Sequence, residues 1–175
     1  MRMILKTLSK IPNGEKVLIF SMFTSCLDLL STAIEKEFGS TFKCEQMDGD
    51  TNGKERNEIL DLFAKDVNVR GLLMTYKVGS EGLNITSANH VICIEPWWTF
   101  AVPLQAEARC WRPGQTKTVN VHNIYINNTI EQRVLEICED KRSMAKSFLE
   151  STEHSSKTST KLDKYTLGRI LGVYM

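Results

Sequence analysis

Several features that mark specialised classes of protein are missing from this 175-residue sequence. Its five cysteines never form the C-x-x-C pair of a zinc site or redox centre, so we interpret them as reduced thiols. No apolar run approaches the ~18 residues that span a bilayer, and we expect no membrane partner. The 22 Lys and Arg residues balance 21 Asp and Glu residues. Any basic surface for nucleic acid must therefore be local.

Two motifs of complete nucleotide pockets are also absent. The sequence has no G-x-x-x-x-G-K-[ST] loop to cradle phosphates, since Gly14-Glu15-Lys16 lacks both the spacing and the hydroxyl. It has no acidic D-E-x-H element for magnesium. The three histidines lack the spacing of metal ligands, so we expect no metal site. The chain alone therefore cannot build a nucleotide pocket, and we expect it to be part of a larger protein.

Short apolar runs alternate with helix-length amphipathic segments, which is typical of a parallel sheet covered by helices. The strands are expected at residues 17–20, 42–47, 71–74, 91–94 and 119–126. The helices are expected at residues 24–38, 54–64 and 102–110 and from residue 130 onward. The predicted fold class is therefore α/β, an open parallel sheet with helices on both faces.

The composition changes near the end of the chain. We interpret residues 1–150 as one domain, since 151–161 is polar and has no large apolar residue, which is typical of a linker. Residues 162–175 are apolar again, and we expect a short helical element that docks back on the domain.

The most specific segment is residues 105–115, which read Q-A-E-A-R-C-W-R-P-G-Q. In a helix starting near Val102, Gln105, Arg109 and Arg112 project from one face. Two guanidinium groups in this arrangement suit a phosphate, because each can donate paired hydrogen bonds to its oxygens. The alternative is that both arginines are solvated surface charges, and the residues alone leave the two interpretations open.

This segment, with Gly82-Leu83-Asn84 and Trp97-Trp98 before it, closely resembles helicase motifs five and six of the SWI/SNF-like DNA translocases of helicase superfamily two. Residues 95–102, E-P-W-W-T-F-A-V, are similar to the D-P-W-W-N-P-A-V of the subgroup that contains the helicase-like transcription factor. Residues 2–150 follow that family's C-terminal RecA-like lobe, and Val17 to Thr24 resembles motif four. The resemblance thus implies a RecA-like helicase C-terminal domain.

The resemblance implies an ATP site shared with a second lobe. Arg109 and Arg112 match arginine fingers, which stabilise the charge of a transferring phosphoryl group and are worth roughly 10³–10⁵ in rate. Gln105 would position a finger or the nucleotide, and Gly82 would contact the nucleotide. ATP with Mg²⁺ would be held mainly by the N-terminal RecA-like lobe of the same protein.

The resemblance also implies contacts to double-stranded DNA. Hydroxyl groups or helix N-termini at Ser21, Thr24 and Thr51 are candidate phosphate contacts, although each residue could instead be an ordinary N-cap. Trp98 matches a tryptophan that leans on DNA. The other matching positions are Thr75, Lys77, Gly79 and Asn84.

The expected function is the second motor lobe of an ATP-dependent double-stranded DNA translocase of the chromatin-remodelling or repair type, inactive without the first lobe. Its expected partners are duplex DNA, the N-terminal lobe and DNA-bound protein substrates. The resemblance alone implies a nuclear location. The alternative is a non-catalytic DNA- or protein-binding lobe of a degenerate helicase-like protein. A dinucleotide-binding fold is disfavoured because residues 79–82 lack the third glycine of G-x-G-x-x-G.

Overall fold

The computed structural model describes residues 1–79, 82–97 and 101–154. The chain divides into two compact units. Unit 1 comprises Met1–Glu95 and Ala101–Tyr125, and unit 2 comprises Pro96–Phe100 and Ile126–Met175. Unit 1 contains the whole sheet, and each unit is described by itself.

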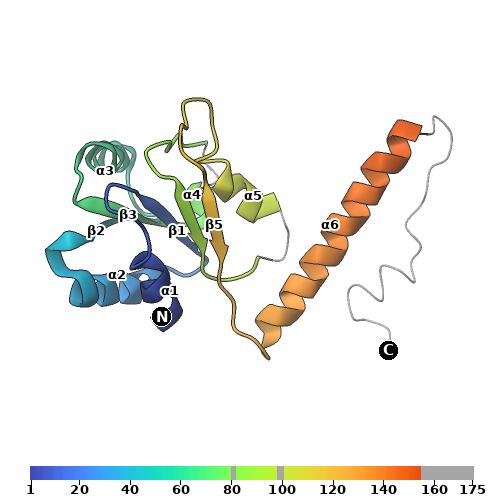
Figure 1. Cartoon of the computed structure of the whole chain (residues 1–175), viewed down its shortest axis with the longest axis horizontal. Helices are drawn as coiled ribbons and strands as arrows, with labels where there is room; N and C mark the ends of the chain where they lie inside the picture. The colour runs from blue at the N-terminus through green and yellow to red at the C-terminus, as the bar shows by residue number, and fades with distance from the viewer. Residues whose placement is uncertain (80–81, 98–100, 155–175) are drawn as a thin grey trace. The chain divides into compact units, whose positions relative to one another are not determined.

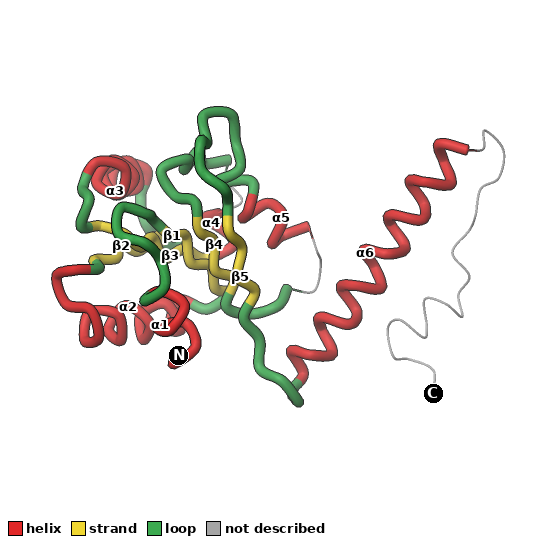
Figure 2. Tube along the Cα trace, in the orientation of Figure 1, coloured by secondary structure: helices red, strands yellow, loops and turns green. Residues whose placement is uncertain are grey.

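A five-stranded parallel sheet forms the centre of unit 1 (Figure 2). Its strands are β1 (Val17–Ser21), β2 (Lys43–Met47), β3 (Val69–Thr75), β4 (His90–Cys93) and β5 (Asn120–Asn123), and their order is β2-β3-β1-β4-β5. Every residue of β1 is buried, as expected for a strand covered on both faces. In the register, Ser21 of β1 pairs with Thr75 of β3, and Phe20 pairs with Cys93 of β4. The carboxyl ends of these three strands therefore meet at one edge.

Helices cover both faces of the sheet (Figure 1). Those of unit 1 are α1 (Arg2–Leu8), α2 (Thr24–Phe38), the 3₁₀ helix η1 (Gly39–Thr41), α3 (Gly53–Lys65), α4 (Tyr76–Gly79) and α5 (Ala101–Glu107). On one face, α1 and α2 bury their apolar stripes against Ile19 and its neighbours in β3 and β4. On the other face, the Tyr76 ring of α4 stacks on Phe20 with 5.6 Å between centroids, and Phe63 of α3 is fully buried. The predicted α/β fold is therefore confirmed.

Several elements differ from the predictions, including β5, which spans Asn120–Asn123 instead of residues 119–126. Helices α1 and α4 were not predicted, because helices of two turns or fewer carry little periodicity. Helix α5 ends at Glu107 rather than at residue 110, and the chain continues in turns.

Unit 2 contains helix α6 (Ile130–His154). Its start is held by side chains that reach back: Glu131 Oε2 accepts from the Ile126 amide at 2.7 Å, and Gln132 Oε1 accepts from the Asn128 amide at 3.1 Å. The helix continues four residues beyond the predicted boundary at residue 150, and the predicted C-terminal element at 162–175 lies outside the described residues. In the described part of the chain, no helix has both the length and the hydropathy of a membrane span.

The close approach of β2 and β3 gives a stability prediction at Gly71. A Cβ atom there would lie 2.3 Å from Cys44 Sγ and 3.1 Å from Phe42 Cε1. We expect Gly71→Ala to lower the free energy of unfolding by about 2 kcal/mol, because the added carbon overpacks the strand contact. Urea denaturation of the chain measures this loss.

Cys44→Ala tests the cause of that loss, because it removes the sulfur from the contact. Combined with Gly71→Ala, it should recover more than half of the lost stability. Gly49→Ala is the matched control, since Gly49 has open space around its Cβ position. An equal loss at Gly71 with and without the Cys44 sulfur would contradict the overpacking argument.

Candidate functional site

The two arginines of the 105–115 segment lie beyond the end of α5, in the turns that follow it. Arg109 Nε donates to the Gln105 carbonyl at 3.0 Å, and Arg112 Nε donates to the Ala108 carbonyl at 3.0 Å. Each side chain thus folds back by four residues. The prediction that one helix presents both arginines is wrong at this point, because α5 ends at Glu107 and turns orient the two side chains.

Both guanidinium groups reach the same loop after α4. Arg109 Nη1 donates to the Leu83 carbonyl at 3.4 Å, and Arg112 Nη1 donates to the Gly82 carbonyl at 3.2 Å. Gly82 has a φ of +79°, a conformation that glycine adopts without strain. The structure therefore brings Arg109, Arg112 and Gly82 together, as the motifs predict, while the exposed Gln105 contributes its carbonyl.

The electrostatics of this arginine pair favour an anion. The side chain of Arg109 is buried, and burial lowers the pKa of its guanidinium, with a further lowering from the nearby positive charge of Arg112. Within the described residues, neither guanidinium forms an ion pair with a carboxylate. Two neighbouring positive charges whose partners in the described part of the chain are carbonyl groups retain donors for a phosphate.

A glutamine without an assigned role fixes this loop from the other side. Gln115 Nε2 donates to the Ala88 carbonyl at 2.7 Å and to the Thr86 carbonyl at 3.1 Å. The Ile85 amide also donates to the Arg109 carbonyl at 3.0 Å. The loop at residues 82–88 is therefore tied to the arginine segment along its length. A side-chain amide directly after the Pro-Gly turn is the sequence signal for this contact.

The predicted DNA residues after β3 lie beside the arginine pair's loop. Thr75 ends β3, and its buried hydroxyl has no hydrogen-bond partner within the described residues. Lys77 is exposed on α4, Gly79 ends that helix, and Asn84 is exposed in the loop. A buried hydroxyl without a partner costs about 1–3 kcal/mol, so it fits a position where a ligand supplies the partner.

Two other predicted contacts lie at the starts of helices. Thr24 is exposed and is the first residue of α2, and Phe23 is the N-cap. Thr51 precedes α3, where Asn52 is the N-cap and accepts from the Glu55 amide at 3.0 Å. The alternative that these threonines are N-caps is therefore wrong. The predicted contact Trp98 lies outside the described residues.

Ser21 requires a correction. Its side chain is fully buried, and its hydroxyl donates to Glu95 Oε1 at 2.7 Å. The Ser21 hydroxyl oxygen also accepts from the Phe23 amide at 3.1 Å. A hydroxyl enclosed in this way offers no surface to DNA, so Ser21 shapes the turn before α2 instead of contacting a phosphate. Sequence reasoning missed Glu95, which lies 74 positions away in the chain.

The family of the chain follows from its sequence as well as from this geometry. The family model described as "Helicase conserved C-terminal domain" matches residues 1–114. The chain belongs to this family.

Relatives and solved structures agree with this helicase C-terminal domain. "Putative helicase 172L" of Invertebrate iridescent virus 6 is 55% identical over 166 residues, which are 94% of this chain and 27% of that protein. The C-terminal part of the Fun30 ATPase domain is 31% identical with a TM-score of 0.73, over 77% of this chain and 43% of that one. The Sulfolobus solfataricus SWI2/SNF2 ATPase core, solved with double-stranded DNA, is 30% identical with a TM-score of 0.63, over 86% and 30%.

These similarities confirm the predicted resemblance to SWI2/SNF2-type helicases and to their C-terminal lobe. The chain spans about a quarter of the length of its viral relative.

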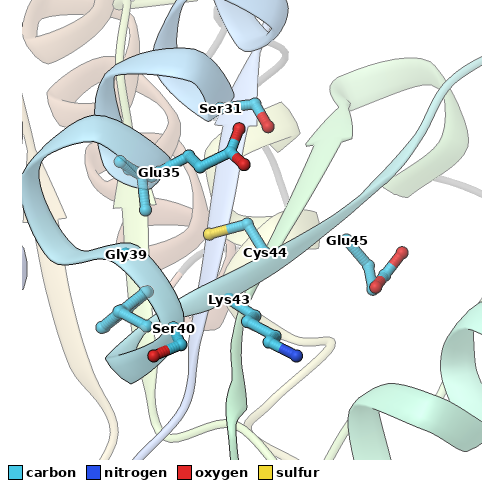
Figure 3. Close-up of a pocket in the computed structure, with 9 residues that line it drawn as sticks. Ser31, Glu35, Gly39, Ser40, Lys43, Cys44 and Glu45 are labelled. Atoms are coloured by element: carbon cyan, nitrogen blue, oxygen red, sulfur yellow. The ribbon is translucent and has the colours of Figure 1, made fainter.

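A separate cavity of about 590 Å³ lies between α2 and the edge strand β2 (Figure 3). The Cys44 sulfur extends from β2 to the side of Glu35, whereas Glu45 extends to the opposite side. Burial raises the pKa of the Cys44 thiol to about 12, so this thiol is unreactive at neutral pH. None of the predicted site residues that the structure describes lines the cavity, which is therefore distinct from the arginine pair of this helicase domain.

Proposed function

We propose that this helicase C-terminal domain is the second motor lobe of an ATP-dependent double-stranded DNA translocase. One observation carries the proposal: Arg109 and Arg112 lie together on the Gly82–Leu83 loop without a carboxylate partner in the described part of the chain. The intact motor hydrolyses ATP, and chromatin remodelling or repair is the implied setting. That DNA-bound proteins are its substrates and that it acts in the nucleus stay predictions.

The arginine pair would act on the nucleotide across the cleft between two lobes. Hydrolysis of ATP supplies the energy of the cycle and spreads negative charge over the terminal phosphate oxygens. Arg112 and Arg109 would donate to these oxygens, and Gln105 would position the arginines. Mg²⁺ fits this lobe poorly, because the described residues hold no cluster of three or more His, Cys, Asp or Glu side chains that could hold it. The metal would be bound mainly by the N-terminal RecA-like lobe.

The loop contacts suggest how DNA binding is coupled to the ATP site. The segment from Thr75 to Asn84 carries the proposed DNA contacts of this lobe, joined by Thr24, Thr51 and Trp98. The carbonyls of Gly82 and Leu83 in the same segment accept from the two arginines. A displacement of the loop on DNA would therefore move both guanidinium groups. Closure and reopening of the two lobes would then shift the grip on DNA in each cycle.

ATPase assays on the isolated chain and on the full-length protein distinguish this function from its alternative. We expect no ATP turnover by the chain alone, with or without duplex DNA, because the phosphate-binding loop is absent. The full-length protein should hydrolyse ATP faster with duplex DNA and displace a bound third strand without separating the duplex. A full-length protein that binds duplex DNA but never hydrolyses ATP would overturn the motor and favour the non-catalytic lobe.

A further inference from the structure

Glu95 is a carboxylate at the carboxyl edge of the sheet to which the motifs assign no role. Its Oε1 atom accepts from the Ser21 hydroxyl at 2.7 Å, and its Oε2 atom accepts from the Met22 amide at 3.1 Å. Both donors belong to the turn between β1 and α2. Ser21 is fully buried and Glu95 is half-buried, so the contact between them is only partly exposed to solvent.

The turn held by Glu95 leads directly into α2. The Met22 amide is bound by Glu95, and the Phe23 amide is bound by the Ser21 hydroxyl at 3.1 Å. The following amides, of Thr24 and Ser25, belong to the first turn of the helix, where the backbone supplies no acceptor. Glu95 and Ser21 thus fix the direction in which the exposed start of α2 presents its donors.

Glu95 also contacts the segment that follows β3. The Tyr76 hydroxyl donates to the Glu95 carbonyl at 3.4 Å, and the Tyr76 ring stacks on Phe20 of β1. Tyr76 lies between Thr75 and Lys77, two proposed DNA contacts. Since β1 lies between β3 and β4 in the sheet, Glu95, two residues after β4, contacts both the β1–α2 turn and the segment after β3.

We propose that Glu95 is a positioning residue for DNA binding, whose carboxylate holds the β1–α2 turn so that Thr24 and the start of α2 meet a backbone phosphate. The proposal rests on the proposed function. The carboxylate itself repels a phosphate, so it acts only through the donors that it holds. It places Thr24 at a fixed distance from the Thr75–Lys77 segment, and two phosphate contacts of one lobe then keep a constant spacing.

The test uses Glu95→Gln in the full-length protein, since the glutamine keeps the shape but replaces one acceptor oxygen with a donor. We expect a roughly 10-fold increase in the duplex DNA concentration that gives half-maximal ATPase rate, as for the loss of about one phosphate contact. The KM for ATP should not change. Ser21→Ala should also raise this DNA concentration, and the double variant should raise it by less than the two single changes combined, because both changes break the contact between the Ser21 hydroxyl and Glu95.

Glu131→Gln is the matched control. Glu131 also accepts from a backbone amide, at 2.7 Å, but at the start of α6. It should leave the DNA concentration for half-maximal rate unchanged. An unchanged DNA requirement in Glu95→Gln, or a uniform loss of rate at every DNA concentration, would overturn the positioning role.

Hydrogen exchange shows whether a negative result contradicts this inference or the proposed function. The Met22 amide should exchange roughly 10-fold faster in Glu95→Ala than in the unchanged protein, because its acceptor is removed. Unchanged exchange at Met22 would overturn the inference even where the motor is active. Faster exchange in a protein that shows no DNA-stimulated ATPase would support the contact and contradict only the proposed function.

Discussion

Arg112→Ala is expected to lower the DNA-stimulated ATPase rate of the full-length protein by roughly 10³-fold or more. The reason is that Arg112 is only partly buried and that its guanidinium binds only carbonyl groups within the described residues. In the proposed motor, its charge would therefore be available to the terminal phosphate of ATP. Steady-state ATP hydrolysis with saturating duplex DNA measures the effect, and DNA affinity without nucleotide should remain within about 2-fold.

A second variant distinguishes the role of the positive charge of Arg112 from that of its planar guanidinium group, and a third is a control. Arg112→Lys keeps the positive charge but loses the planar fork, so we expect it to recover only a small part of the rate. Arg133→Ala is the matched control, because Arg133 is an exposed arginine that pairs with Glu136 at 2.9 Å on α6. Hydrolysis that persists in Arg112→Ala at the rate of this control would refute the arginine-finger role.

The elements that sequence analysis predicted well are those with a strong local signal. Helix α2 has the predicted bounds, because Leu27, Leu30 and Ile34 repeat at helical spacing and Gly39 follows with a φ of +54°. Strand β1 is buried on both faces and has the expected continuous apolar run. The order of the strands in the sheet, by contrast, depends on contacts between distant segments and left no local pattern.

Only part of the geometry of the candidate site could be predicted, again because contacts between distant segments leave no local pattern in the sequence. The motifs identified the residues that the structure brings together around Gly82, but not how their side chains are oriented. The predicted end of α5 was wrong because the chain forms turns after Glu107. There both arginines donate to carbonyls of the distant Gly82–Leu83 loop. Ser21 was misassigned because its partner, Glu95, is far away in the sequence. Local patterns therefore indicate which residues are candidates for the site, whereas long-range hydrogen bonds decide which of their side chains are enclosed by the protein.

Arg109→Ala is expected to have two separable effects, because Arg109 is much more buried than Arg112. Only 7% of its surface is exposed, and the alanine variant leaves the Gln105 and Leu83 carbonyls without their donor. We expect the free energy of unfolding of the chain to fall by about 1–3 kcal/mol, against less than about 1 kcal/mol for Arg112→Ala. Urea denaturation of the two variants in parallel measures this difference.

The second effect of Arg109→Ala is on the chemistry. A buried guanidinium whose pKa is lowered by burial and by Arg112 gains from an anion brought to the pair, since a phosphate offsets both penalties. We therefore expect a loss of at least about 10²-fold in DNA-stimulated hydrolysis by the full-length protein at a temperature where the variant stays folded. A variant that loses stability but keeps its hydrolysis rate would show that Arg109 only holds the loop. The motor would then depend on Arg112 alone, and the link from the DNA-binding loop to the nucleotide would run through the Gly82 carbonyl.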